Sequence, residues 1–187
     1  MDLQIINTAM GDASIMAEVT ANNQLSCRST VVTALHEATL NGDAYAWNSV
    51  SANIDATDVL LTVRNLSQTR PLVINRIYAW VDVPSALDIH IQTSTTAFAT
   101  GTVVTGVNLN STSSKAADAE AYTDDDGISQ GTIVATLHTN EATADIFPID
   151  FLTNDSIVLG TNGICSIDGI AEMLVFECTF IGYFIDT

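Results

Sequence analysis

Positively charged residues are scarce in this chain. Its 187 residues contain five Lys and Arg against 22 Asp and Glu, so the formal net charge is -17 at pH 7. A surface of this sign repels the phosphates of nucleic acids and the anionic head groups of membranes. We therefore expect neither nucleic acid nor a membrane among the partners. Solubility, or adaptation to a salty medium, would favour the same acidity.

Cysteines and long apolar runs are also scarce. Cys27, Cys165 and Cys178 are an odd set without CxxC spacing, which predicts neither a disulfide framework nor a zinc site. Cys178 shares strand parity with Phe176 and Phe180, so we expect a buried, unreactive thiol. No run approaches the ~18 apolar residues of a membrane span. The first residues lack the basic and apolar regions of a signal peptide, so we expect no conventional export.

Apolar residues nevertheless make up 47% of the chain. Short segments rich in Val, Ile and Thr recur at near-regular spacing, and turn-forming Asn, Asp and Gly separate them. This pattern predicts an antiparallel sandwich or barrel. Only 113–122 has helical character, over a turn or two. The expected strands are 14–20, 25–36, 58–64, 72–83, 87–92, 102–107, 131–138, 144–151, 156–159 and 171–185.

The predicted organisation is a single domain. Residues 41–187 should form an all-β, antiparallel, jelly-roll-like sandwich, and residues 1–40 a strand or arm region that packs on it. The near-continuous apolar segment 171–185 needs cover on both faces and should be a central strand. Residues 93–127 are small and polar, which predicts a long excursion with a short strand at 102–107. We expect it to lie over the sandwich or over a neighbouring subunit.

Motifs for catalysis or metal binding are weak. Asp88 and His90 share a strand face, but a single pair of this kind is more often an ordinary surface or rim histidine. The DDDG stretch at 124–127 lacks the ligand spacing of a calcium loop, so we predict a solvated acidic turn, with a loosely held surface cation as the alternative. The chain has no nucleophile elbow, Walker loop or dinucleotide-binding glycine motif. We predict no enzyme activity, catalytic residue, metal ligand or cofactor.

Three of the five cations, Arg64, Arg70 and Arg76, fall within thirteen residues. They belong to the stretch 60–82, which predicts a β-hairpin with Arg64 and Arg76 on its strands. Copies that each carry -17 repel one another, so a symmetric assembly needs cations where its faces meet. Arginine suits this role because its guanidinium binds a carboxylate through two parallel hydrogen bonds.

We therefore predict that the three arginines meet the acidic stretch 118–127 of a neighbouring copy, head to tail, as a closed ring requires. Asp124, Asp125 and Asp126 are the predicted acidic interface residues. The alternative is that the arginines pair within their own chain, with Arg70 the one most typical of a solvated turn residue.

Two segments resemble bacteriophage virion proteins. In one recurring pattern of that group, a G-[DN]-A-Y-x-W element precedes a strand ending in R/K-N-x-S, and a second strand follows. Residues 41–82 contain both, as GDAYAW and RNLS. Residues 101–127 are similar to a second segment, in which a TGVNLN stretch leads into an alanine-rich, acidic run. Together the two segments cover about a third of the chain.

The resemblance implies a small all-β structural component of a phage particle. The leading expectation is an outer capsid decoration or cement protein on the virion surface. Its partners would be further copies of itself, as a homotrimer, and the major capsid protein. The alternative is a tail, fibre or baseplate module that binds host-surface glycan, which needs an exposed aromatic platform from Tyr45, Trp47 or Trp80. A free-standing adhesive β-domain is a third interpretation.

Overall fold

The structure is a computed structural model that describes residues 16–19, 25–28, 32–54, 58–81, 86–96, 98, 100–124, 131–138, 149–169 and 173–186. The chain divides into two compact units, Met1–Ala34 and Leu35–Thr187. In the first unit, β1 (Met16–Val19) and β2 (Leu25–Arg28) pair as an antiparallel hairpin.

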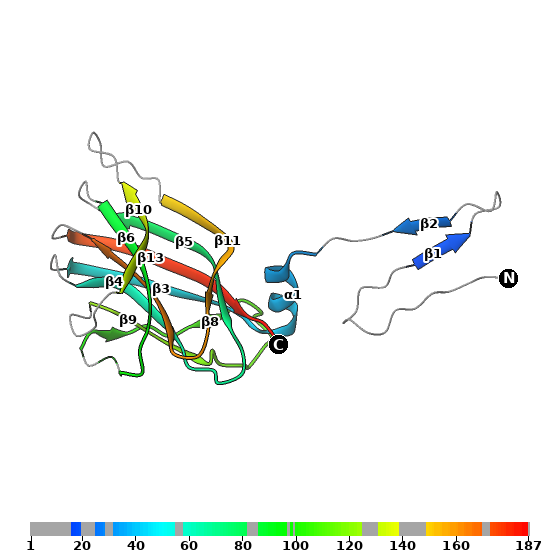
Figure 1. Ribbon diagram of the computed structural model, residues 1–187, viewed down its shortest axis with the longest axis horizontal. Coiled ribbons are helices and arrows are strands. Elements are labelled where there is room, and N and C mark those ends of the chain that lie inside the picture. Colours follow the sequence, from blue (N-terminus) through cyan, green and yellow to red (C-terminus); the bar gives the residue numbers. More distant parts are fainter. Residues whose placement is uncertain are drawn as a thin grey trace. The chain divides into compact units, whose positions relative to one another are not determined.

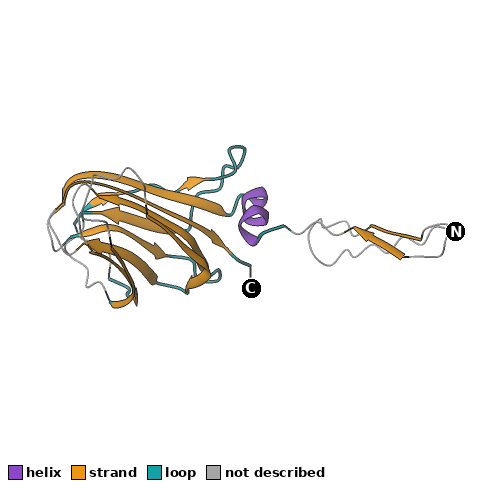
Figure 2. Cartoon of the chain, turned by 90° about the horizontal axis from the view of Figure 1, so that it is seen from above, coloured by secondary structure: helices purple, strands orange, loops and turns teal. Residues whose placement is uncertain are grey.

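The second unit consists, as described, of two antiparallel sheets and one short helix, so the predicted all-β sandwich is confirmed (Figure 2). The six-stranded sheet has the order β10-β6-β12-β4-β9-β7, and the five-stranded sheet the order β11-β5-β13-β3-β8. The first contains β4 (Val59–Asn65), β6 (Ala86–Thr93), β7 (Thr102–Val103), β9 (Ala119–Thr123), β10 (Thr132–His138) and β12 (Gly163–Gly169). The second contains β3 (Ala44–Ile54), β5 (Leu72–Val81), β8 (Val107–Asn108), β11 (Ile149–Leu159) and β13 (Met173–Phe184).

The long strands pair in a nested order. β3 pairs with β13, β4 with β12, β5 with β11 and β6 with β10, all antiparallel. Successive strands β3, β4, β5 and β6 alternate between the two sheets, and β10 to β13 return in the same alternation (Figure 1). β13 lies between β5 and β3, which confirms the C-terminal segment as a central strand. The jelly-roll form of the sandwich stays a prediction.

The hairpin predicted over 60–82 is wrong. β4 pairs with β12 and β9 in one sheet, whereas β5 pairs with β11 and β13 in the other. A hairpin needs a tight connection, but the six residues between these strands cross from sheet to sheet. Every residue of β4 is buried, so its pattern has no solvent face that would indicate a partner. Arg64 and Arg76 consequently lie in different sheets.

The core fills the space between the sheets. Trp47 from β3 and Phe176 and Phe180 from β13 are fully buried there, facing aliphatic residues of β4, β6 and β12. Cys178 is 1% exposed, which confirms the predicted buried thiol. Burial raises the pKa of Cys165 to about 12 and raises that of Cys178 well above its usual value.

One helix, α1 (Ala34–Asn41), departs from the prediction. The sequence predicted a strand through residue 36 and helical character at 113–122, but the structure has a loop and then β9 over the latter. α1 packs Ala38 against Ala44, Val73 and Tyr183, on the outer side of the five-stranded sheet. Tertiary packing therefore stabilises a helix too short to form alone. No helix in the described ranges is long and apolar enough to cross a membrane.

Gly42 ends α1 in a Schellman motif. Gly42 N–H donates to Thr39 O at 3.1 Å and Asp43 N–H to Ala38 O at 2.8 Å, with Gly42 at φ +74. A Cβ at this position would also lie 2.3 Å from Ser113 Oγ. The position therefore requires glycine twice over, for its backbone angle and for the close approach of the excursion.

The polar excursion extends the edges of both sheets. β8 pairs with β3, while β7 and β9 lie beside β4 in the other sheet. The single short strand predicted at 102–107 is thus two strands, and β9 was not predicted. Gly106 lies against the Trp47 indole, where a Cβ would be 2.6 Å from Nε1. The excursion therefore closes over the chain's own core.

Candidate functional site

Arg64 lies at the centre of the first of two ion-pair clusters. It is 5% exposed on β4, directly opposite Glu120 on β9, with which it forms an ion pair. Its Nη1 donates to Thr96 O and, at 3.3 Å, to Ser94 O. The guanidinium carbon lies 5.1 Å from the centroid of the Phe98 ring. Arg64 therefore binds the start of the excursion to two strands of the sandwich.

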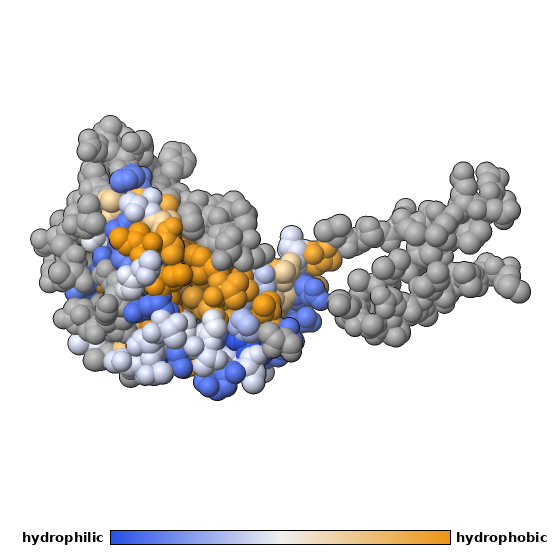
Figure 3. Space-filling view, in the orientation of Figure 1, coloured by the Kyte–Doolittle hydropathy of each residue, from blue (hydrophilic) through white to orange (hydrophobic). Residues whose placement is uncertain are grey.

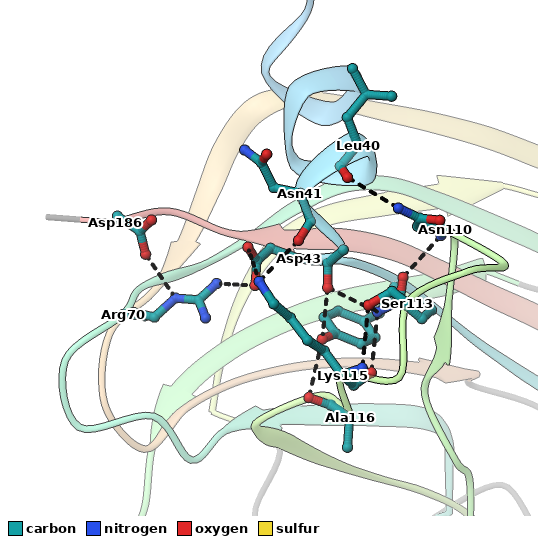
Figure 4. Close-up of polar contacts among 12 residues, drawn as sticks. Leu40, Asn41, Asp43, Arg70, Asn110, Ser113, Lys115, Ala116 and Asp186 are labelled. Carbon is teal, nitrogen blue, oxygen red and sulfur yellow. Dashed lines mark hydrogen bonds and ion pairs between the residues drawn. The ribbon is translucent and has the colours of Figure 1, made fainter. Parts of the chain in front are cut away.

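Asp43 lies at the centre of the second cluster, shown in Figure 4. Its Oδ1 is 2.7 Å from Arg70 Nη2 and its Oδ2 is 3.0 Å from Lys115 Nζ. Arg70 also reaches Asp186 Oδ1 through Nε at 3.1 Å and stacks over the Phe184 ring. Three segments that are far apart in sequence thus meet at the Asp43 carboxylate, and Arg70 links a fourth, the C-terminal Asp186, to them.

Electrostatics keep the Asp43 carboxylate ionised. Burial alone would raise its pKa, but hydrogen bonds and charge interactions with Arg70 and Lys115 outweigh burial and hold the pKa below its usual value. Asp43 is 8% exposed, so the carboxylate would be costly without these cations. The cluster is therefore a mutually dependent group of charges.

The excursion also caps the end of α1. Three successive carbonyls there receive a side-chain donor: Asn110 Nδ2 to Leu40 O at 3.0 Å, Lys115 Nζ to Asn41 O at 2.9 Å, and Asn108 Nδ2 to Gly42 O at 2.8 Å. The last carbonyls of a helix have no partner inside the helix. The cation also lies at the negative end of the helix dipole. Lys115, the only lysine of the chain, therefore joins α1 to the ion-pair cluster.

Asn65 organises the crossing between β4 and β5. It is fully buried, and its Nδ2 donates to Arg70 O at 2.9 Å and to Leu159 O at 2.8 Å. Its Oδ1 accepts from Ser67 N–H at 2.9 Å. The same Asn65 thus fixes the turn that presents Arg70 to Asp43.

The predicted arginine patch is not a single patch. Arg64 and Arg70 each pair with carboxylates of their own chain, which is the alternative that the sequence left open. Arg70 is not the merely solvated turn residue that we expected. Arg76 Nη1 donates to Tyr78 Oη at 2.8 Å on the outer side of the other sheet.

The acidic residues of the predicted interface do not form a single patch either. Glu120, within the acidic stretch expected to meet a neighbouring copy, pairs with Arg64 of the same chain. Asp124 is exposed at φ 59 directly after β9. Asp125 and Asp126 lie outside the described residues. An interface role for these residues stays a prediction.

A row of buried polar side chains crosses the outer side of the six-stranded sheet. His90, Ser166 and Thr62 are register partners on β6, β12 and β4, and they are 6%, 2% and 1% exposed. Both His90 ring nitrogens and both hydroxyls lack a hydrogen-bond partner. The expected surface or rim histidine is therefore wrong for His90. In the part of the chain that the structure describes, no three His, Cys, Asp or Glu gather as a metal site.

Sequence reasoning missed Asp43, Asn108, Asn110 and Lys115. Two signals could have indicated them. A single lysine in a chain of -17 is expected to lie near carboxylates, and Asn-Gly-Asp is a sequence at which a helix can end. Comparison with protein-family models and with curated proteins finds no match to this chain.

Proposed function

We propose that this protein is a structural, non-enzymatic component of a bacteriophage particle, an outer capsid decoration (cement) protein that stabilises the shell. The observation that carries the proposal is the nested pairing of β3–β13, β4–β12, β5–β11 and β6–β10 with alternation between sheets. We infer from this order that the sandwich is a jelly roll, an eight-stranded form that recurs in viral capsid and lectin domains.

The resemblance of 41–82 and 101–127 to phage virion proteins favours the capsid role, and the structure gives those segments a shared task. The GDAYAW element supplies the glycine that ends α1, the Asp43 carboxylate and the core tryptophan. The NLN stretch supplies the two asparagines that cap α1. Both segments thus stabilise one end of the sandwich.

The charge distribution supports a place on the outer surface of the particle. Arg64, Arg70 and Lys115 already have carboxylate partners, so three of the chain's five cations neutralise internal acids. The surface left to solvent is strongly anionic, which suits a protein that does not contact the packaged genome and that keeps particles apart. The partners we propose are further copies, as a homotrimer, and the major capsid protein.

The proposal is tested with particles made without this protein. Purified protein added to such shells should bind to saturation and raise the temperature at which the shells release DNA, measured by dye fluorescence during heating. A protein that does not bind, or binds without a change in that temperature, contradicts the cement role.

A glycan-binding tail module is the second candidate, favoured by one observation. Tyr45 and Trp47 are buried in the core, which removes them from the expected platform, but Trp80 and Tyr78 are half-buried on the outer side of β5, opposite Glu177 and Thr179 of β13. Aromatic rings beside hydrogen-bonding side chains suit a sugar face. Replacing Trp80 by Ala should abolish adsorption to host cells if this function is correct, and replacing the exposed Val158 by Ala should not.

A further inference from the structure

β10 has an open edge. Among the described strands it pairs only with β6, at the end of the six-stranded sheet. Soluble proteins usually protect such edges with Lys, Pro, inward charges or very short strands. β10 is seven residues long and reads TIVATLH, with no Lys, Pro or acidic residue, and its pairing with β6 shifts register between Ile133 and Ala135. At the other end of this sheet, β7 has only two residues.

Apolar side chains accompany that edge. Ile133 and Val134 on β10 are 53% and 45% exposed, and Ile91 on β6 is 38% exposed. Figure 3 shows hydrophobic residues gathered in a band that extends from the region of β10 toward α1. β10 also contains no acidic residue, in a chain with 22 of them, whereas the edge strand β11 contains two. The strand itself therefore adds no carboxylate that would repel another copy at -17.

The hairpin of β1 and β2 is an incomplete sheet. It has four residue pairs and no third strand among the described residues, and it belongs to a different compact unit from the sandwich. A two-stranded hairpin of this size is at best marginally stable in water, because a third strand or a packed face is needed. Its two strands carry one acid, Glu18, and one base, Arg28, so the hairpin is not repelled by its own net charge.

The connection to α1 favours a neighbouring copy as the acceptor. Residues 29–33 join β2 to α1, and five residues span at most ~20 Å. α1 packs on the outer side of the five-stranded sheet, whereas β10 borders the other sheet, and Figure 1 shows the two on different sides of the sandwich. Because the connection is short and leads to α1 rather than toward β10, we infer an acceptor edge in a neighbouring copy.

We propose that the β1–β2 hairpin of each copy adds onto the β10 edge of a neighbouring copy and extends its six-stranded sheet to eight strands. This contact deepens the assembly role and rests on the proposed function. Hairpin and edge are different surfaces, so the contact is head to tail and closes into a ring such as a trimer. Backbone hydrogen bonds along β10 supply affinity, and Ile133 and Val134 become covered.

Sedimentation of the full-length chain tests the contact independently of any particle. Wild type should sediment as a closed oligomer, and Val134→Lys and Ala17→Pro should each sediment as monomers, because one blocks the edge and the other breaks β1. Val103→Lys is the matched control, an exposed valine on the opposite edge of the same sheet. Far-ultraviolet circular dichroism verifies folding, and Ile133→Lys replaces Val134→Lys if the latter is unfolded.

Mixing the two monomeric variants separates a contact between copies from one within a chain. The Val134→Lys copy keeps its hairpin and the Ala17→Pro copy keeps its edge, so the mixture should form dimers and nothing larger. A monomeric wild type, a variant that still assembles, a control that dissociates, or a mixture that stays monomeric each overturns the inference. The virion role fails separately, if the protein does not bind shells.

Discussion

Removing the charge of Arg64 should destabilise the folded chain rather than its assembly. The Arg64 and Glu120 side chains are 7% and 23% exposed, so both ends of this pair are largely removed from water. Breaking a buried pair by removing one partner costs about 3–5 kcal/mol, because the remaining charge is left uncompensated. The partial exposure of Glu120 lets water compensate in part, so we expect Arg64→Met to lower the free energy of unfolding by about 2–4 kcal/mol.

A double-mutant cycle isolates the pair. Glu120→Gln alone leaves Arg64 with its two carbonyl acceptors and should cost less, about 1–2 kcal/mol. Arg64→Met combined with Glu120→Gln should recover part of the loss, because no uncompensated carboxylate remains. Urea unfolding followed by tryptophan fluorescence measures each variant.

The reasoning is refuted if Arg64→Met changes the free energy of unfolding by less than ~0.5 kcal/mol, the range of ordinary surface substitutions. It is also refuted if that variant dissociates oligomers while unfolding at the wild-type urea concentration. That second result would restore Arg64 to the interface role that the sequence suggested.

Three further predictions concern single side chains. The pKa of Asp43 is lower in the folded chain than its unfolded-state value near 3.8, so the ionised carboxylate stabilises the fold above that value and this stabilisation is lost as the pH falls through the folded-state pKa. Asp43→Asn should therefore be less stable than wild type at pH 7 and should lose less stability than wild type upon acidification. Urea unfolding at each pH measures both effects. Gly42→Ala should lower the thermal unfolding temperature, at a cost of at least ~1 kcal/mol. Thr62→Val should be neutral or stabilising, because it removes a buried hydroxyl without a partner and keeps its shape; a loss above ~1 kcal/mol would mean that the hydroxyl is satisfied.

Fold class was predictable from the sequence because its signals are local. Turn residues between short Val- and Ile-rich segments indicated a sandwich, and the apolar character of the C-terminal strand indicated that β13 is central. The strand partners were not predictable in the same way. β4 and β5 are neighbours in sequence, but their partners are up to about a hundred residues away. Both faces of β4 are buried, so it has no solvent-facing pattern that would reveal its partners.

The ion-pair clusters show the same limit. The unusual density of arginines was visible, but Arg64 finds Glu120 only because β9 returns beside β4, and Arg70 finds Asp43 only because Asn65 turns the chain after β4. The count of charges predicts that each cation pairs with a carboxylate, but it does not say which carboxylate, or whether that carboxylate belongs to the same chain. The short helix was missed because its stability comes from contacts with Ala44 and Tyr183 rather than from its own sequence.

The central claim, a capsid decoration protein, is tested most directly by quantitative mass spectrometry of purified phage particles. The account predicts this chain at hundreds of copies per particle, in a fixed ratio to the major capsid protein. About a dozen copies or fewer would place it at the tail or a vertex, and its absence from purified particles would contradict the account.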